Sequence, residues 1–194
     1  MEDPREGLEI QWSAGDCTVT ERLWVPSEEA MLVREFSVEG ATAWSEATLE
    51  LALYANPVLY THFTTGECGL AAAGYRGISL TTDAPCATLE RTMRIALTRE
   101  RPNCTVVYHL QDASQMPSLR SLSAVERAQL RAEARASWRE TTKPIIPVTN
   151  TFERDCERLF AASVVALRAA ISTEGAFDAS LFQYGFEWSG DASM

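Results

Sequence analysis

The chain has 194 residues, of which 46% are hydrophobic and 23% are charged, a composition typical of a soluble globular protein. Asp and Glu outnumber Lys and Arg by 27 to 17, and the net charge of −10 disfavours nucleic acid and anionic lipid as partners. The sequence has no run of about 18 apolar residues, and its first residues lack the basic and apolar regions of a signal peptide. We therefore expect a cytoplasmic protein with no nucleic-acid partner and no membrane partner.

Residues 7–110 alternate between apolar and polar side chains in short segments that turn residues separate, a pattern typical of β-strands. Leu49, Leu51 and Leu53 should point to one face of such a strand, while the intervening Glu50 points to the other. Six or seven strands are expected, among them Cys17–Val25, Met31–Val38, Thr48–Tyr54, Tyr75–Thr81, Thr88–Leu97 and Cys104–Leu110. Because no helical pattern interrupts them, they predict an antiparallel β-sandwich in residues 1–116.

The pattern changes to a helical one after the sandwich. Ser123 and Glu126 have the spacing of a capping box, which predicts a helix from Ser123 to Trp138. Its apolar residues Val125, Leu130 and Trp138 are sparse, so we expect only a narrow stripe of this helix to be buried.

The prolines in Lys143–Pro147 predict an extended segment, so residues 117–149 should form a linker helix followed by an extended linker. A second helix is expected to begin near Asn150. Its apolar residues recur at helical spacing and form a broad stripe: Phe152, Cys156, Leu159, Phe160, Val164, Leu167 and Ile171. One linker helix is too short to cover such a stripe. We therefore expect residues 150–194 to begin a helical domain that continues beyond this chain.

Cysteine and histidine do not form a recognisable site in the sequence. The five cysteines are far apart, and no Cys-x-x-Cys pair occurs, which disfavours a zinc site or a redox dithiol. We expect buried free thiols at Cys17, Cys68, Cys86, Cys104 and Cys156. His62 and His109 also stand alone, and His62 is expected to be packed against other side chains. No metal ligand and no cofactor are predicted.

The most distinctive segment is Tyr184–Ser193, which contains three aromatic residues, two carboxylates and two glycines. The flat rings of Tyr184 and Trp188 can stack on a sugar, and the carboxylates of Glu187 and Asp191 can accept hydrogen bonds from sugar hydroxyls. These four residues are the predicted substrate-binding residues. The alternative interpretation is a loop whose aromatic side chains cover the end of a helix.

A sandwich, a linker helix, an amphipathic helix and then the motif Tyr-Gly-aromatic-x-Trp-x-x-Asp resemble the domain junction of family 15 glycoside hydrolases, the glucoamylase-like enzymes. The segment Thr20–Phe36 resembles a strand pair of their N-terminal supersandwich. The segment Arg154–Ala170 resembles the first helix of their (α/α)6 barrel. The resemblance therefore implies a β-rich domain followed by the first, incomplete part of an α/α barrel.

The resemblance assigns roles to two residues. Trp188 and Asp191 match the Trp and Asp with which the family lines its glucose pocket, whereas Ser189 and Gly190 replace a Pro and an Arg. The missing guanidinium removes a bidentate donor to sugar hydroxyls, so the sugar specificity is open. The general acid and base of the family lie further along the barrel, and no position here matches them. No catalytic residue is predicted in this chain.

The resemblance thus implies the N-terminal part of a glycosidase that acts on α-glucans or related α-glycosides and is inactive as this piece alone. Its partners would be an oligosaccharide or polysaccharide substrate and the missing barrel helices. Two alternatives stay open. One is a related trehalase or sugar phosphorylase, and the other is a non-catalytic carbohydrate-binding or structural sandwich module.

Overall fold

A computed structural model describes residues 7–26, 29–40, 44–53, 60–74, 77–111 and 119–142, together with Phe160 and Ser163. The chain divides into two compact units, formed mainly by Gly7–Ala134 and Arg135–Met194. The sheets and the first turns of the helix described below belong to the first unit.

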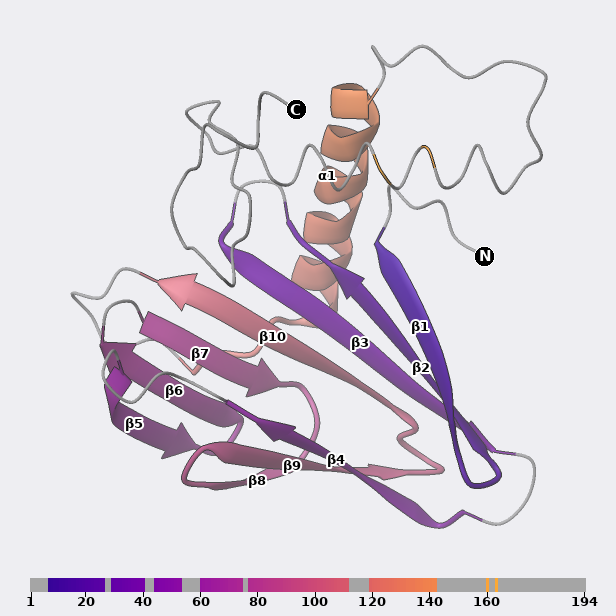
Figure 1. The fold of residues 1–194 in the computed structure, drawn as a ribbon, viewed down its shortest axis with the longest axis vertical. Helices are drawn as coiled ribbons and strands as arrows, with labels where there is room; N and C mark the ends of the chain where they lie inside the picture. The colour runs from indigo at the N-terminus through magenta and orange to yellow at the C-terminus, as the bar shows by residue number, and fades with distance from the viewer. Residues whose placement is uncertain are drawn as a thin grey trace. The chain divides into compact units, whose positions relative to one another are not determined.

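The described residues form ten strands and one long helix (Figure 1). The strands are β1 (Leu8–Ala14), β2 (Cys17–Trp24), β3 (Met31–Gly40), β4 (Glu46–Ala52), β5 (Tyr60–Gly66), β6 (Gly69–Gly74), β7 (Gly77–Thr82), β8 (Cys86–Leu89), β9 (Thr92–Thr98) and β10 (Asn103–Gln111). The helix is α1 (Ala124–Thr142). Among the described residues, no helix has the length and apolar character needed to span a membrane.

The strands form two antiparallel sheets. The large sheet has seven strands in the order β1-β2-β3-β10-β7-β6-β5, and the small sheet has three in the order β4-β9-β8. A two-residue turn joins β1 to β2, where Gly15 adopts a φ of 63° that side chains disfavour. The β-rich antiparallel prediction is therefore confirmed for the described residues.

The main hydrophobic core contains residues of both sheets. Burial along β9 alternates, so that Met93, Ile95 and Leu97 are buried and the residues between them are exposed. From the small sheet these side chains meet one face of the large sheet, which we call the inner face. The core consists of Phe36, Val38, Leu51, Leu53, Leu70, Ala72, Leu80, Ala84, Met93, Ile95, Leu97, Cys104 and Val106.

The other face of the large sheet, which we call the outer face, carries a smaller apolar cluster. It consists of Trp24, Met31, Val33 and Val107. Leu122, just before α1, and Leu130, within α1, pack against this cluster. In the first unit, the large sheet therefore has the small sheet on its inner face and the start of the helix on its outer face.

The start of α1 is held by the predicted capping box. The Ser123 backbone N–H donates to Glu126 Oε2 at 2.9 Å, and the Glu126 backbone N–H donates to Ser123 Oγ at 3.3 Å. The predicted buried stripe is wrong at Val125, which is 77% exposed, because that position faces away from the sheet. Leu130, which belongs to the predicted stripe, is half-buried and packs on the outer face, and Ala134 is buried although it was not named in the stripe.

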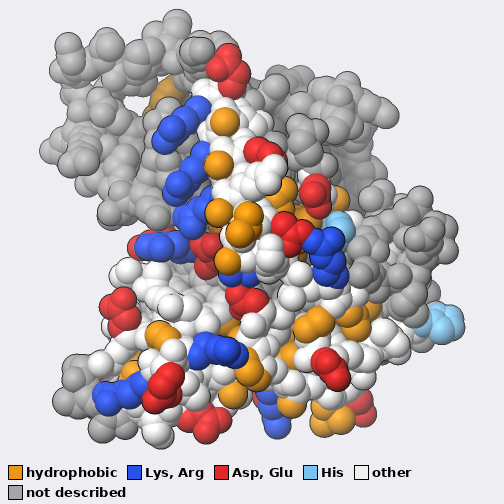
Figure 2. All heavy atoms as spheres, turned by 180° about the vertical axis from the view of Figure 1, so that it is seen from behind, with side chains coloured by type: hydrophobic (Ala, Val, Ile, Leu, Met, Phe, Trp, Pro, Cys, Tyr) orange, Lys and Arg blue, Asp and Glu red, His pale blue; other side chains and the backbone are white. Residues whose placement is uncertain are grey.

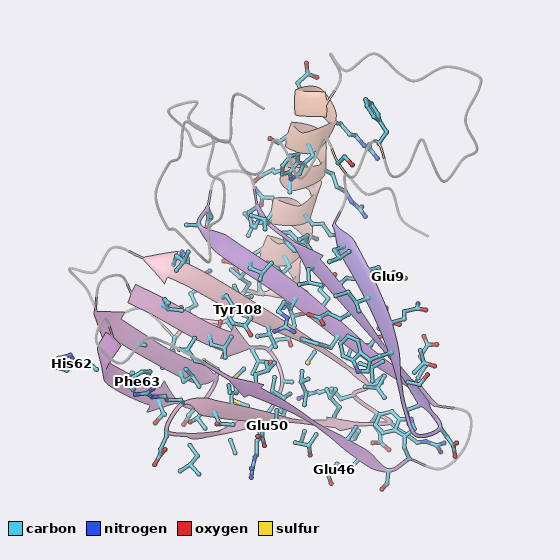
Figure 3. All side chains as sticks on the ribbon, in the orientation of Figure 1. Glu9, Glu46, Glu50, His62, Phe63 and Tyr108 are labelled. Atoms are coloured by element: carbon cyan, nitrogen blue, oxygen red, sulfur yellow. The ribbon has the colours of Figure 1, made fainter. Side chains whose placement is uncertain are left out.

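Several predicted strands correspond to observed ones, but the predicted number of six or seven is wrong, since the described residues form ten strands. The expected single strand Thr88–Leu97 is a hairpin of β8 and β9, because the chain turns at Glu90 with a φ of 51°. The strands β1, β5 and β6 were not among those named. His62, expected to be packed, is exposed on β5 (Figure 3). The predicted alternation at Leu49–Leu53 is confirmed, since Leu51 and Leu53 are buried while Glu50 is exposed.

Candidate functional site

The four predicted substrate-binding residues, Tyr184, Glu187, Trp188 and Asp191, lie outside the described residues. The (α/α)6 barrel prediction also falls almost wholly outside them. The described geometry therefore concerns the sandwich and the start of the helix, where two hollows open on the outer face of the large sheet.

The first hollow, which we call the polar hollow, has a volume of about 370 Å³. Strands β2, β3 and β10 supply its floor, and the first turns of α1 supply one wall. Its lining is rich in hydroxyl, amide and guanidinium groups and consists of Thr20, Arg22, Glu35, Phe36, Ser37, Asn103, Cys104, Thr105, Arg127 and Arg131.

Each arginine of the polar hollow has a carboxylate partner. Arg131 donates to Glu35 at 2.9 Å, Arg127 lies 2.9 Å from Asp83, and Arg22 lies 3.0 Å from Glu9. These pairs leave the hollow close to electrically neutral. It therefore offers hydrogen bonds suited to a neutral polyhydroxyl molecule more than to an anion.

Two of these pairs also fix the helix to the sheet. Both are partly buried, with side-chain exposures of 17% and 30% for Arg127 and Asp83 and of 20% and 27% for Arg131 and Glu35. Asp83 is held in turn, because its Oδ1 accepts a hydrogen bond from the backbone N–H of Thr105 at 2.8 Å. We call these two pairs the helix clamp. Figure 2 shows acidic and basic side chains gathered around the first turns of the helix.

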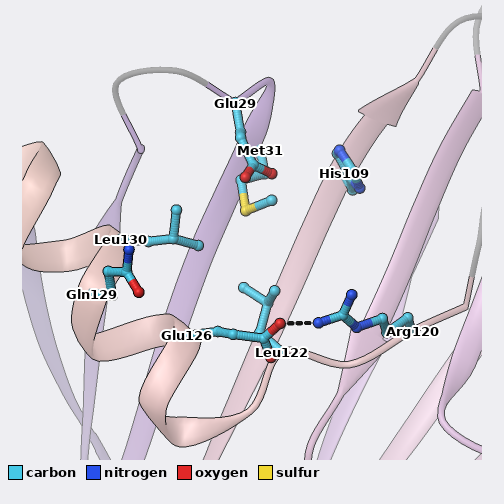
Figure 4. Close-up of a pocket in the computed structure, with 8 residues that line it drawn as sticks. All are labelled: Glu29, Met31, His109, Arg120, Leu122, Glu126, Gln129 and Leu130. Atoms are coloured by element: carbon cyan, nitrogen blue, oxygen red, sulfur yellow. Dashed lines mark hydrogen bonds and ion pairs between the residues drawn. The ribbon is translucent and has the colours of Figure 1, made fainter.

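The second hollow has a volume of about 410 Å³ and is more apolar at its base (Figure 4). Met31, Leu122 and Leu130 contribute apolar surface, and charged or polar groups stand around them. The polar lining residues are Glu29, His109, Arg120, Glu126 and Gln129. Arg120 is paired with Glu126, so the helix cap itself forms part of this wall.

A buried ion pair lies on the inner face of the large sheet. Glu21 is 3% exposed, and its carboxylate accepts a hydrogen bond from Arg34 Nε at 2.5 Å. The Arg34 guanidinium also donates to the Tyr108 hydroxyl at 2.8 Å and lies over the rings of Phe36 and Tyr108. Burial opposes the charge of Arg34, but its contacts with Glu21 and Tyr108 outweigh burial and raise its pKa.

The cysteines of the described residues are free thiols, as predicted, but only Cys104 is fully buried. Burial, with a smaller contribution from Asp83, raises the pKa of Cys104 to about 12. Burial also raises the pKa of Cys86, and the nearby Cys68 adds to that shift. Cys156 lies outside the described residues.

No protein-family model matches this chain, and no curated protein is closely similar to it. Within the described part of the chain, no group of three or more His, Cys, Asp or Glu side chains is placed to hold a metal ion.

Sequence reasoning did not find the polar hollow or the helix clamp. The partners of the clamp are far apart in the sequence, with Arg131 and Glu35 separated by 96 positions. The one local signal was the capping box, which correctly placed the start of the helix that carries Arg127 and Arg131.

Proposed function

We propose that this chain is the N-terminal part of a glycoside hydrolase that acts on α-glucans or related α-glycosides. The observation that best supports the proposal is the order of structures along the chain. An antiparallel two-sheet domain is followed by a helix, which is the order that the resemblance to glucoamylase-like enzymes implies for a sandwich and a linker helix.

In this proposal the sandwich and the start of α1 support the enzyme and take no part in bond cleavage. The helix clamp and the capping box hold the first turns of α1 against the sheet. The substrate-binding residues would be Tyr184, Glu187, Trp188 and Asp191. Glycoside hydrolysis needs two carboxyl groups on opposite sides of the scissile bond, and we place both of them downstream of this chain.

Glucose release from maltooligosaccharides tests the proposal. We expect none from the 194-residue chain and measurable release from the product of the gene read beyond Met194. In that longer product, Asp191→Ala should lower kcat/KM by at least tenfold, because a sugar hydroxyl loses a charged acceptor. Asp16→Ala, in the exposed turn between β1 and β2, is the matched control and should change nothing.

The substrate panel also separates the related enzymes. Hydrolysis of trehalose alone would indicate a trehalase. Cleavage of a disaccharide only with added inorganic phosphate would indicate a phosphorylase. If the longer product binds glucans and cleaves none of these substrates, the hydrolase proposal is wrong.

The polar hollow favours a second candidate, a carbohydrate-binding module. Its hydroxyl and amide groups and its near-neutral charge suit a sugar, and a volume of about 370 Å³ can hold one or two rings. Calorimetry of the chain with maltose, glucose and trehalose tests this. Under this candidate, Asn103→Ala abolishes binding and Trp188→Ala does not, whereas the hydrolase proposal expects the reverse.

A further inference from the structure

Two cysteines from different sheets lie at the same turn of the fold. Cys68 is in the turn between β5 and β6 of the large sheet, and Cys86 begins β8 of the small sheet. Cys86 Sγ lies 3.5 Å from the backbone oxygen of Glu67, the residue directly before Cys68. Both thiols are free and half-buried. One thiol from each sheet therefore lies at this turn.

Cys68 also contacts the segment that leads into the helix. Its Sγ–H donates a hydrogen bond to the backbone oxygen of Leu119 at 2.6 Å. In the same place, the Leu119 side chain covers Gly66, where an added Cβ would lie 2.8 Å from a Leu119 methyl carbon. The thiol of Cys68 is thus the donor that joins the β5–β6 turn to the approach of α1.

We propose that Cys68 and Cys86 are a modification site that forms a reversible disulfide with a low-molecular-weight disulfide, such as oxidised glutathione, as oxidant. Forming this bond removes the hydrogen bond to Leu119, because a disulfide sulfur carries no proton to donate. The long spacing of the cysteines in the sequence disfavours a redox dithiol, but the fold places Cys86 beside the turn that contains Cys68.

The disulfide between Cys68 and Cys86 would form in two thiol–disulfide exchange steps. The thiolate of Cys68 attacks one sulfur of oxidised glutathione, so a Cys68–glutathione bond forms and one glutathione thiolate leaves. The thiolate of Cys86 then attacks the Cys68 sulfur, the protein disulfide forms, and the second glutathione leaves. The two protein thiols are oxidised, one glutathione disulfide is reduced to two glutathione thiols, and the two protons from the cysteines pass to these thiols.

The second step needs the thiolate of Cys86. Burial raises the pKa of Cys86, so little of it is thiolate at neutral pH. The protein disulfide should therefore form more than about tenfold faster at pH 9 than at pH 7. Closure also requires the Cα atoms of Cys68 and Cys86 to lie about 4.4–6.8 Å apart.

Peptide mapping of the whole chain tests the site. After incubation with oxidised glutathione and alkylation of the remaining thiols, mass spectrometry should find a fragment pair that links Cys68 to Cys86. In Cys86→Ser, Cys68 should stay joined to glutathione, because no second thiol displaces it. Cys17→Ser, which removes a half-buried thiol at the start of β2, is the matched control and should leave the link unchanged. Separate adducts on Cys68 and Cys86 in the unsubstituted chain, or no reaction at either, would overturn the proposal.

Hydrogen exchange tests the consequence for the helix approach. In the linked protein, the amides of residues 120–122 should exchange at least threefold faster than in the reduced protein, while those of β9 keep their rates. Treatment with dithiothreitol should restore the slower exchange. A linked protein with unchanged exchange at residues 120–122 would show that the bond to Leu119 does not hold this segment.

Discussion

The two faces of the large sheet are covered in different ways. On the inner face, a broad apolar cluster built from both sheets excludes water along the sandwich. On the outer face, a smaller apolar cluster lies under the start of α1, and two ion pairs together with a capping box hold the helix there. Apolar burial dominates the first interface, and specific polar contacts carry much of the second.

This difference predicts an order of opening. Apolar burial contributes about 25 cal/mol per Å² over a large area, whereas a partly exposed ion pair contributes at most about 1 kcal/mol. The start of the helix should therefore leave the outer face well before the two sheets separate. Substitutions on the inner face should lower the global free energy of unfolding, and those on the outer face should act mainly on the helix.

The largest effect is expected at the buried ion pair of the inner face. Glu21→Ala leaves the charge of Arg34 uncompensated, and we expect a loss of about 3–5 kcal/mol in the free energy of unfolding. The control is Glu50→Ala, which removes the partner of Arg94 from an exposed pair and should cost less than about 1 kcal/mol. Urea unfolding followed by circular dichroism measures both. Equal losses for the two variants would mean that burial does not determine how much each ion pair contributes to the free energy of unfolding.

A pair of apolar truncations compares the two faces directly. Ile95 is fully buried in the inner core, so Ile95→Ala should cost about 2–5 kcal/mol. Leu130 is half-buried on the outer face, and Leu130→Ala should cost about 1–2 kcal/mol because less apolar area returns to water. A larger loss from Leu130→Ala in urea unfolding would reverse the proposed order of opening.

The pH dependence of the free energy of unfolding shows whether water reaches the thiol of Cys104 in the inner core. Its pKa rises from 9.0 to about 12 in the folded chain, so the folded state holds a proton that the unfolded state releases between these values. This contribution to stability is fully present below pH 9 and is lost as the pH rises toward 12. The slope should approach 1.4 kcal/mol per pH unit, an order-of-magnitude value. Cys104→Ala should flatten the curve, and parallel curves for the two proteins would show that water reaches this thiol.

The sequence predicts the inner face better than the outer one because alternation is a local signal. Leu49, Leu51 and Leu53 alternate with polar residues, and such a pattern is sufficient to identify a half-buried strand. Strands β5 and β6, which were not named, carry little of that signal, whereas β1 does alternate and was overlooked. In β6, Ala71 and Ala72 are fully buried although alanine is not a typical strand residue, and the turn at Glu90 contains no glycine, proline or asparagine.

The outer face depends on contacts that no local pattern encodes. Arg127 pairs with Asp83 and Arg131 with Glu35, and in the sequence these arginines read only as charges on an exposed helix. The position of Cys86 beside the turn that carries Cys68 likewise appears only once the two sheets are stacked. The predicted sugar-binding residues rest on the motif at Tyr184–Asp191, and the described geometry leaves that prediction untested.

The smallest expected loss of stability is at the helix cap. This loss tests whether the start of the helix opens before the sandwich does. Ser123→Ala removes the acceptor for the Glu126 backbone N–H and should cost about 0.5–2 kcal/mol. Because the helix start opens separately from the sandwich, the loss should appear as faster hydrogen exchange at residues 126–130, with the amides of β9 and β10 unchanged. Ser121→Ala, two residues earlier and outside the capping box, is the matched control and should leave exchange in the helix unaltered. Ser123→Ala could instead speed hydrogen exchange equally in the helix and in the strands of the inner core. That result would show that the two faces unfold as one unit, so that their different contacts do not set the order in which they open.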